Sequence, residues 1–127
     1  MAHEPAAVPG IEVREADRLR RQPDGASLPA ILVDVREPAE IIAMRAEDAV
    51  VLPLSQFARR YRELPTDRPL LIVCRSGERS AMAAGYLIHN GYPQAANVSG
   101  GMIAWERAGL PVQRGPLAPG EGDLPRP

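Results

Sequence analysis

Short apolar runs alternate with segments of helical composition along most of this chain. Nearly unbroken apolar runs are typical of strands buried on both faces of a sheet, and strands are predicted at residues 31–35, 49–52 and 70–73, with a shorter one at 96–98. Helical patterns lie between and after these strands, at residues 39–46, 55–64, 79–90 and 102–108. This alternation predicts the α/β class, with a small parallel β-sheet flanked by helices on both faces.

Residue types at the ends of several helices support this assignment. Ser55 has the short polar side chain favoured at an N-cap, and Pro65 stops the same helix. Gly91 permits the left-handed turn that ends the helix before it. Gly100 and Gly101 predict a tight turn from the last strand into the last helix.

The two ends of the chain differ from the part between them. Residues 1–10 contain two prolines and a glycine and are predicted to be a flexible leader, with order beginning near Ile11. The last eighteen residues hold five Pro and three Gly, too few apolar groups to offset the entropy of ordering. We therefore expect one domain at 11–112, which suits a length of 127 residues, and an extended or disordered tail at 113–127.

The composition excludes several mechanisms. All fifteen basic residues are Arg, which rules out phosphate-loop and Schiff-base lysines, and one Cys cannot form a disulfide or a CxxC pair within one chain. The net charge of −1 gives no reason to expect a nucleic-acid partner or an anionic membrane. The N-terminus lacks a basic segment followed by an apolar run, so a cytoplasmic location without membrane contact is expected.

Cys74 stands where the third apolar strand ends, and a polar, Gly-containing turn leads from it directly into a helix. Backbone N–H groups and the positive end of the helix converge on such a position. Together with Arg75 and Arg79 they are expected to lower the thiol pKa below its ordinary value of about 8.5, while Glu78 opposes the shift. The alternative is a small buried apolar residue, but such a residue would continue the apolar run.

The length of this turn separates two classes of chemistry. Four residues lie between Cys74 and Arg79, one fewer than in the phosphate-binding loop of cysteine-dependent phosphatases. A shorter loop makes a smaller ring of N–H groups, which suits a terminal sulfur on the cysteine better than a tetrahedral phosphate. The count therefore favours sulfur chemistry.

Three segments in order resemble the signatures of single-domain rhodaneses: VDVREPAE at 33–40, CRSGERS at 74–80 and NVSGGMIAWERAGLPV at 97–112. The resemblance covers residues 11–112 and implies the rhodanese-like fold. It also implies a sulfurtransferase that takes a sulfane sulfur from a donor such as thiosulfate and passes it to cyanide or a thiol. At the matching position, Cys74 would be the catalytic, persulfide-forming nucleophile. The substrate-binding loop around it would consist of Arg75, Ser76, Gly77, Glu78, Arg79 and Ser80.

The resemblance assigns supporting roles to few other residues. Asp34 and Arg36 match the Asp-x-Arg of the family and are interpreted as an ion pair that shapes the crevice. The implied reaction needs no cofactor, metal or general base, in keeping with His3 in the leader and His89 at the far end of a helix. Trp105 is interpreted as core packing.

The chain departs from the family pattern after the first signature. Ile41 stands at a usually aromatic position, and residues 44–49 replace a Gly-His-Ile-Pro-Gly-Ala turn without a change of length. Arg45 takes the place of the histidine. Because this stretch lacks Gly and Pro, residues 39–47 are expected to stay helical longer.

A persulfide on the single cysteine cannot be resolved within the chain, so the sulfur must leave to another molecule. The expected partners are a small sulfur donor and an acceptor, which is cyanide, a thiol such as glutathione, or a sulfur-carrier or thioredoxin-type protein. One alternative is a partner-dependent relay or non-catalytic interaction module. Another is a phosphatase or arsenate reductase, which the loop length and the missing second cysteine disfavour.

Overall fold

The computed structural model describes residues 7–22, 24–25 and 27–125. Five parallel strands form one sheet in the order β1-β6-β5-β2-β4. They are β1 (Gly10–Ile11), β2 (Ile31–Asp34), β4 (Val50–Val51), β5 (Leu70–Val73) and β6 (Ala95–Val98). A separate antiparallel pair consists of β3 (Arg45–Ala46) and β7 (Val112–Gln113).

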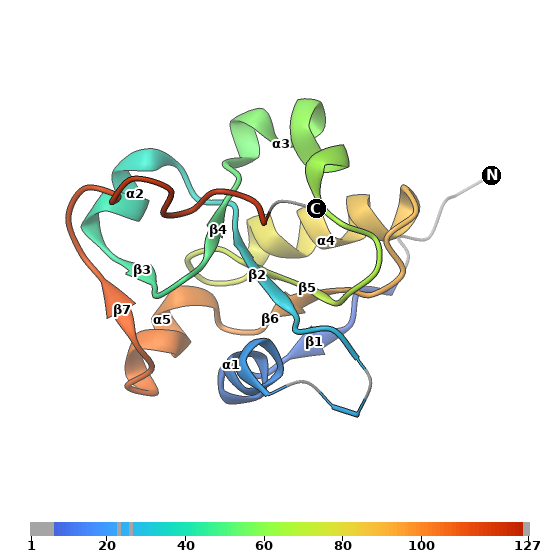
Figure 1. Ribbon diagram of the computed structural model, residues 1–127, viewed down its shortest axis with the longest axis horizontal. Helices are drawn as coiled ribbons and strands as arrows, with labels where there is room; N and C mark the ends of the chain where they lie inside the picture. The colour runs from blue at the N-terminus through green and yellow to red at the C-terminus, as the bar shows by residue number, and fades with distance from the viewer. Residues whose placement is uncertain (1–6, 23, 26, 126–127) are drawn as a thin grey trace.

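Helices cover both faces of this sheet, with α3 and α4 on one face and α1 and α5 on the other (Figure 1). The helices are α1 (Val13–Arg21), α2 (Pro38–Ala43), α3 (Leu54–Arg60), α4 (Glu78–His89) and α5 (Gly101–Arg107), and a 3-10 turn, Tyr61–Glu63, follows α3. α2 lies beside β3. The predicted α/β class, with a parallel sheet between two layers of helices, is confirmed.

Each face of the sheet packs against its own apolar cluster. Side chains alternate along a strand, so Val33 and Ile72 pack toward α3 and α4, whereas Leu32 and Val73 pack toward α1 and α5. All four are at most 2% exposed, which explains why these strands read as unbroken apolar runs. Trp105 is fully buried in the second cluster, as predicted, and its Nε1 donates to a backbone carbonyl at 3.1 Å.

The register of the central strands brings the candidate residues to one edge. Asp34 at the end of β2 lies opposite Val73 at the end of β5, and the Val35 N–H donates to the Val73 carbonyl at 3.0 Å. The chain therefore leaves the sheet at Cys74, beside the start of the Asp34–Arg36 turn. β6 pairs with β5 on the other side, so Val98 reaches the same carboxyl edge.

The predicted cap of α3 is wrong. The helix begins at Leu54, with Pro53 as its N-cap residue. Ser55 lies inside the helix, and its hydroxyl bonds a side chain of another segment instead of capping the helix. The Ser55 N–H and hydroxyl donate to the Glu37 carboxylate at 3.2 and 2.7 Å. These bonds tie the start of α3 to the start of α2.

The longer helix expected over residues 39–47 is also wrong. α2 ends at Ala43, and the backbone enters β3 because Arg45 turns into the protein. The Arg45 side chain is 3% exposed and donates to the Gly115 carbonyl at 2.6 Å and to both Glu121 carboxylate oxygens at 2.6 and 3.0 Å. A buried guanidinium needs such partners, and the C-terminal segment supplies them.

The described part of the tail, residues 113–125, has no helix and runs back from β7 past α2 toward β4 (Figure 1). The Gly115 N–H donates to the Ile42 carbonyl, and the Val51 N–H donates to the Gly122 carbonyl, both at 2.8 Å. The described part of the tail is thus hydrogen-bonded to the domain, and it turns at residues 119–122. The first six residues of the predicted leader, including His3, lie outside the described residues.

Order in the described sheet begins at Gly10, one residue before the predicted start. The hydrophobic pattern did not predict β1 or α1, which form the outer edge and part of the lower layer in Figure 1. Among the described residues, no helix has the length and apolar character needed to cross a membrane.

Candidate active site

Cys74 lies directly after β5 and is 1% exposed. Its Sγ accepts a hydrogen bond from the Gly77 N–H at 3.1 Å and another from the Ser80 hydroxyl at 3.1 Å. Gly77 precedes α4, and Ser80 lies in its first turn. Two residues of the loop, Gly77 and Ser80, therefore donate directly to the sulfur.

Helix α5 holds this loop in place from outside. The Met102 N–H donates to the Cys74 carbonyl at 2.8 Å, and the Ile103 N–H donates to the Arg75 carbonyl at 3.1 Å. In a trans peptide the N–H points opposite to the carbonyl, so the N–H groups of Arg75 and Ser76 point away from α5. The loop can thus present successive donors to the sulfur.

Gly101 makes this close contact possible. A Cβ at this position would lie 2.5 Å from the carbonyl oxygens of both Cys74 and Arg75, and the φ angle of Gly101 is +58°. Only glycine meets both conditions. The sequence predicted a tight turn at Gly100 and Gly101 but did not reveal that Gly101 positions the loop.

Hydrogen bonding favours the thiolate form of Cys74. Burial raises the pKa of the thiol, but bonds from the Ser80 hydroxyl and from the backbone of Ser80, Gly77 and Ser76 lower it further, so the net pKa lies below its ordinary value. The sequence predicted a lowered pKa from the loop N–H groups, the helix end, Arg75 and Arg79. In the structure the largest lowering contribution is the Ser80 hydroxyl, followed by loop N–H groups.

Ser80 connects the sulfur to β6. Its hydroxyl is fully buried and also lies 2.6 Å from the Asn97 Oδ1. Asn97 was not among the site residues predicted from the sequence. The available signal was a polar residue inside a short strand that leads to the paired glycines.

The two arginines of the loop have different surroundings. Arg79 donates two hydrogen bonds to the Glu40 carboxylate, at 2.7 and 2.9 Å, and this pairing lowers the pKa of Glu40 to about 2. Arg75 is exposed and forms no ion pair with the residues that the structure describes. Glu78 is exposed and accepts a hydrogen bond from the Ser76 hydroxyl. Arg75 is therefore the loop cation available to an anion.

Asp34 and Arg36 form a buried ion pair beside the loop. The Arg36 Nε and Nη2 donate to the Asp34 carboxylate at 3.1 and 2.9 Å, and the Arg36 N–H adds a third bond at 3.0 Å. Burial raises the pKa of Asp34, and the Arg36 charge opposes that shift. Arg36 also donates to the Met44 carbonyl at 2.6 Å, so the pair ties the end of β2 to the segment after α2.

Two open cavities flank the loop. One encloses about 320 Å³ and is lined by Arg36, Glu40, Ala43, Met44, Arg75, Met102, Ile103 and Glu106. The other encloses about 490 Å³ and lies between α1 and α5, with Ser76 of the loop in its wall.

Within the described residues, no group of three or more His, Cys, Asp or Glu is arranged to hold a metal ion. His89 is exposed at the end of α4.

A cysteine with a lowered pKa, held in a loop of N–H donors at the carboxyl edge of a parallel sheet, defines a small α/β protein suited to nucleophilic group transfer. The sequence profile of the family described as Rhodanese-like domain matches residues 15–108. The chain belongs to this family.

Individual relatives agree with this assignment. A sulfurtransferase of Allochromatium vinosum is 48% identical over 82 residues, which cover 65% of this chain and 77% of that protein. The thiosulfate sulfurtransferase GlpE of Vibrio cholerae is 32% identical over 103 residues, covering 81% and 92%. Among solved structures, a rhodanese-related protein from Thermoplasma volcanium matches with a TM-score of 0.73 and 26% identity, over 83% of this chain and 97% of that chain.

Proposed function

We propose that this chain is a sulfurtransferase that carries a sulfane sulfur as a persulfide on Cys74. The observation that carries the proposal is the pair of 3.1 Å hydrogen bonds to Cys74 Sγ, from the Gly77 N–H and the Ser80 hydroxyl, in a loop of four residues between Cys74 and Arg79. Similarity to relatives named sulfurtransferases supports the activity, and one of those names supports thiosulfate as a donor.

In the first half-reaction, the Cys74 thiolate attacks the outer sulfur of thiosulfate. A bond forms between the two sulfurs, the bond from the outer sulfur to the sulfonate sulfur breaks, and sulfite leaves with the electron pair of that bond. The exposed guanidinium of Arg75 attracts the dianion to the loop. The loop N–H groups then stabilise the charge on the outer sulfur.

In the second half-reaction, the carbon of cyanide or the sulfur of a thiolate attacks the outer sulfur. The bond to Cys74 Sγ breaks, and Cys74 leaves as the thiolate. The hydrogen bonds that lower its pKa also make it a good leaving group. Because the chain has one cysteine, the acceptor comes from another molecule.

Mass spectrometry of the intact protein tests the persulfide. Treatment with thiosulfate should add about 32 Da, one sulfur atom, and a reductant should remove it. The variant Cys74→Ser should gain no mass and form no thiocyanate from thiosulfate and cyanide. Equal rates of thiocyanate formation in the two proteins would end the proposal.

The protein treated with thiosulfate also distinguishes the proposed activity from the alternative functions. A persulfide that forms readily but reacts slowly with cyanide and small thiols would indicate a dedicated protein acceptor, such as a sulfur-carrier or thioredoxin-type protein. Hydrolysis of a small aryl phosphate that disappears in Cys74→Ser would instead indicate phosphate chemistry.

A further inference from the structure

Asn97 is a polar residue inside the sheet, on a strand whose other residues are apolar. β6 consists of Ala95, Ala96, Asn97 and Val98, and it pairs with β1 on one side and with β5 on the other. Asparagine is depleted in strands, because its side chain competes for the hydrogen bonds of the backbone. The reason for an amide at this position therefore lies in the contacts of its side chain.

The Asn97 side chain lies on the same side of the sheet as the sulfur. Side chains alternate along β6, and Ala95, two residues earlier, packs in the apolar cluster that also contains Cys74. Asn97 Oδ1 lies 2.6 Å from Ser80 Oγ, and a Cβ at Gly77 would lie 3.7 Å from Asn97 Nδ2. The amide thus stands behind both groups that donate to Cys74 Sγ, the Ser80 hydroxyl and the Gly77 N–H.

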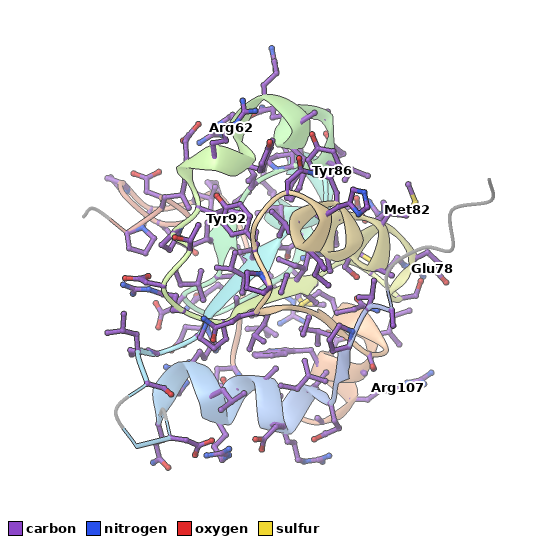
Figure 2. The ribbon with its side chains drawn as sticks, turned by 90° about the vertical axis from the view of Figure 1, so that its right-hand side faces the viewer. Arg62, Glu78, Met82, Tyr86, Tyr92 and Arg107 are labelled. Carbon is purple, nitrogen blue, oxygen red and sulfur yellow. The ribbon has the colours of Figure 1, made fainter. Side chains whose placement is uncertain are left out.

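Solvent does not reach the Ser80 hydroxyl. Ser80 is fully buried and faces β6, whereas Glu78 and Met82 of the same helix point away from the sheet (Figure 2). Among the residues that the structure describes, this hydroxyl bonds only Cys74 and Asn97. Its single hydrogen therefore has two acceptors to choose between, the sulfur and the amide oxygen.

The relative strength of these two acceptors changes during sulfur transfer. A thiolate is a stronger acceptor than an amide oxygen, and an amide oxygen is stronger than a sulfur with two covalent bonds. In the proposed reaction, Cys74 Sγ is a thiolate before it takes up sulfur and has two covalent bonds in the persulfide. The preferred acceptor of the Ser80 hydrogen therefore alternates between Cys74 Sγ and Asn97 Oδ1.

We propose that Asn97 is a positioning residue that holds the Ser80 hydrogen while Cys74 carries sulfur and releases it when the thiolate forms again. The hydroxyl only turns, so no bond to hydrogen breaks. With the hydrogen on the sulfur, the amide turns over and its NH2 group donates to the Ser80 oxygen. An amide serves both states because it has an acceptor end and a donor end. Since one of the two states is the persulfide, this role of Asn97 rests on the proposed function.

Nuclear magnetic resonance of the protein made with isotope-labelled asparagine tests this role without altering the chain. The chain has two asparagines, and Asn90, which donates to the Tyr86 carbonyl at the end of α4, is the internal control. The side-chain NH2 signals of Asn97 should shift as Cys74 ionises and should return when thiosulfate loads the sulfur. The signals of Asn90 should stay in place. Asn97 signals that follow neither change would overturn the proposal.

A double-mutant cycle with Asn97→Asp separates the hydrogen bond from the effect of charge. The carboxylate should keep the Ser80 hydrogen, since 2.6 Å is the separation of a charge-assisted bond between two oxygens, and it also adds a negative charge near the sulfur. The midpoint of iodoacetamide alkylation should rise about one pH unit more when Ser80 is present than in the Ser80→Ala background. Equal rises in both backgrounds would show that charge alone acts, and would overturn the proposal.

The matched control is Ser99→Asp, which places a carboxylate after the same strand at an exposed position. Its effect on the midpoint should be equal with Ser80 and in the Ser80→Ala background. All of these variants keep the charged groups around the loop, namely Asp34, Arg36, Glu40, Arg75, Glu78 and Arg79.

The two tests remain decisive if one part fails. Should Asn97→Asp not fold, as judged by urea unfolding, the asparagine signals of the unaltered protein decide the matter. Absence of the persulfide mass would end the proposed function. The alkylation cycle needs no sulfur transfer, so it would still decide whether Asn97 acts on Cys74 through Ser80.

Discussion

The state of Cys74 is linked to the position of a single proton. The Ser80 hydroxyl lies 3.1 Å from Cys74 Sγ and 2.6 Å from Asn97 Oδ1, but it has only one hydrogen to donate. A thiolate is the stronger acceptor because it is charged, so ionisation of Cys74 draws that hydrogen to the sulfur. Asn97 can then hold the Ser80 oxygen only as a donor, through its amide NH2 group, which requires the amide to be turned over.

Replacing Ser80 with alanine should raise the pKa of Cys74, since it removes the largest contribution that lowers it. Alkylation by iodoacetamide follows the thiolate, so the midpoint of its pH profile should move to higher pH. At neutral pH the rate should fall roughly tenfold, because a hydrogen bond to a charged group contributes about 1.5 kcal/mol. The control is Ser99→Ala, an exposed serine beside the same loop. An unchanged midpoint in Ser80→Ala would contradict this account of the pKa.

At the scale of elements, the contact between α5 and the Cys74 loop leaves no room for a side chain at Gly101. We expect Gly101→Ala to reduce thiocyanate formation at least about tenfold, because a Cβ 2.5 Å from two carbonyl oxygens must displace the loop. Gly109→Ala is the matched control. Gly109 also has a positive φ, +72°, but its Cβ would meet no atom within 4 Å. If both variants lost stability in urea and activity to the same extent, backbone strain rather than loop displacement would be the cause.

A second contact between elements joins the tail to the segment after α2 through Arg45. Arg45→Met should lower the free energy of unfolding by about 3 kcal/mol, because it leaves the Gly115 carbonyl and the Glu121 carboxylate without their partner. Arg114→Met removes an exposed pair with Glu106 and should cost less than about 1 kcal/mol. Urea unfolding of both variants measures the difference. Similar small losses would mean that the tail contributes little to stability.

How far the sequence predicted each element depended on where its stabilising contacts come from. The central strands and the Cys74 loop were predicted because each has a local sequence pattern. The strands are unbroken apolar runs, and the loop is a polar turn between a strand and a helix. In α1, by contrast, only Val13 and Ala16 are buried, and Arg20 stacks over the Trp105 ring at 5.1 Å. That helix depends on α5, far along the chain, so its own pattern is weak.

The same distinction applies to the candidate site. Local spacing identified Cys74 and its loop. The burial of Arg45 depends on a carbonyl seventy residues away and on Glu121. The residues next to Arg45 in the sequence give no sign of these contacts. The pairing of Arg79 with Glu40 likewise joins segments 39 residues apart. Such contacts follow from packing, which a single sequence without its fold does not specify.

At the scale of the whole molecule, every side-chain cation except histidine is an arginine, and many carboxylates pair with one. Pairing with Arg18, Arg60 or Arg45 lowers the pKa of the carboxyl group. The carboxylates concerned include Glu15, Asp24, Glu63 and Glu121. A carboxyl whose pKa is lowered by folding stabilises the folded state only while it is ionised. The molecule should therefore lose stability in acid.

Glu40 allows this loss to be measured at the active site. Its pKa is about 2 in the folded protein against an ordinary value of 4.5, so its contribution is complete above about pH 4.5 and disappears as the pH falls toward 2. The melting temperature should drop more between pH 5 and pH 3 in the unaltered protein than in Glu40→Gln, which cannot titrate at this position. Identical slopes in Glu40→Gln and the unaltered protein would show that the Glu40–Arg79 pair does not link folding to proton binding, even though it joins α2 to the Cys74 loop.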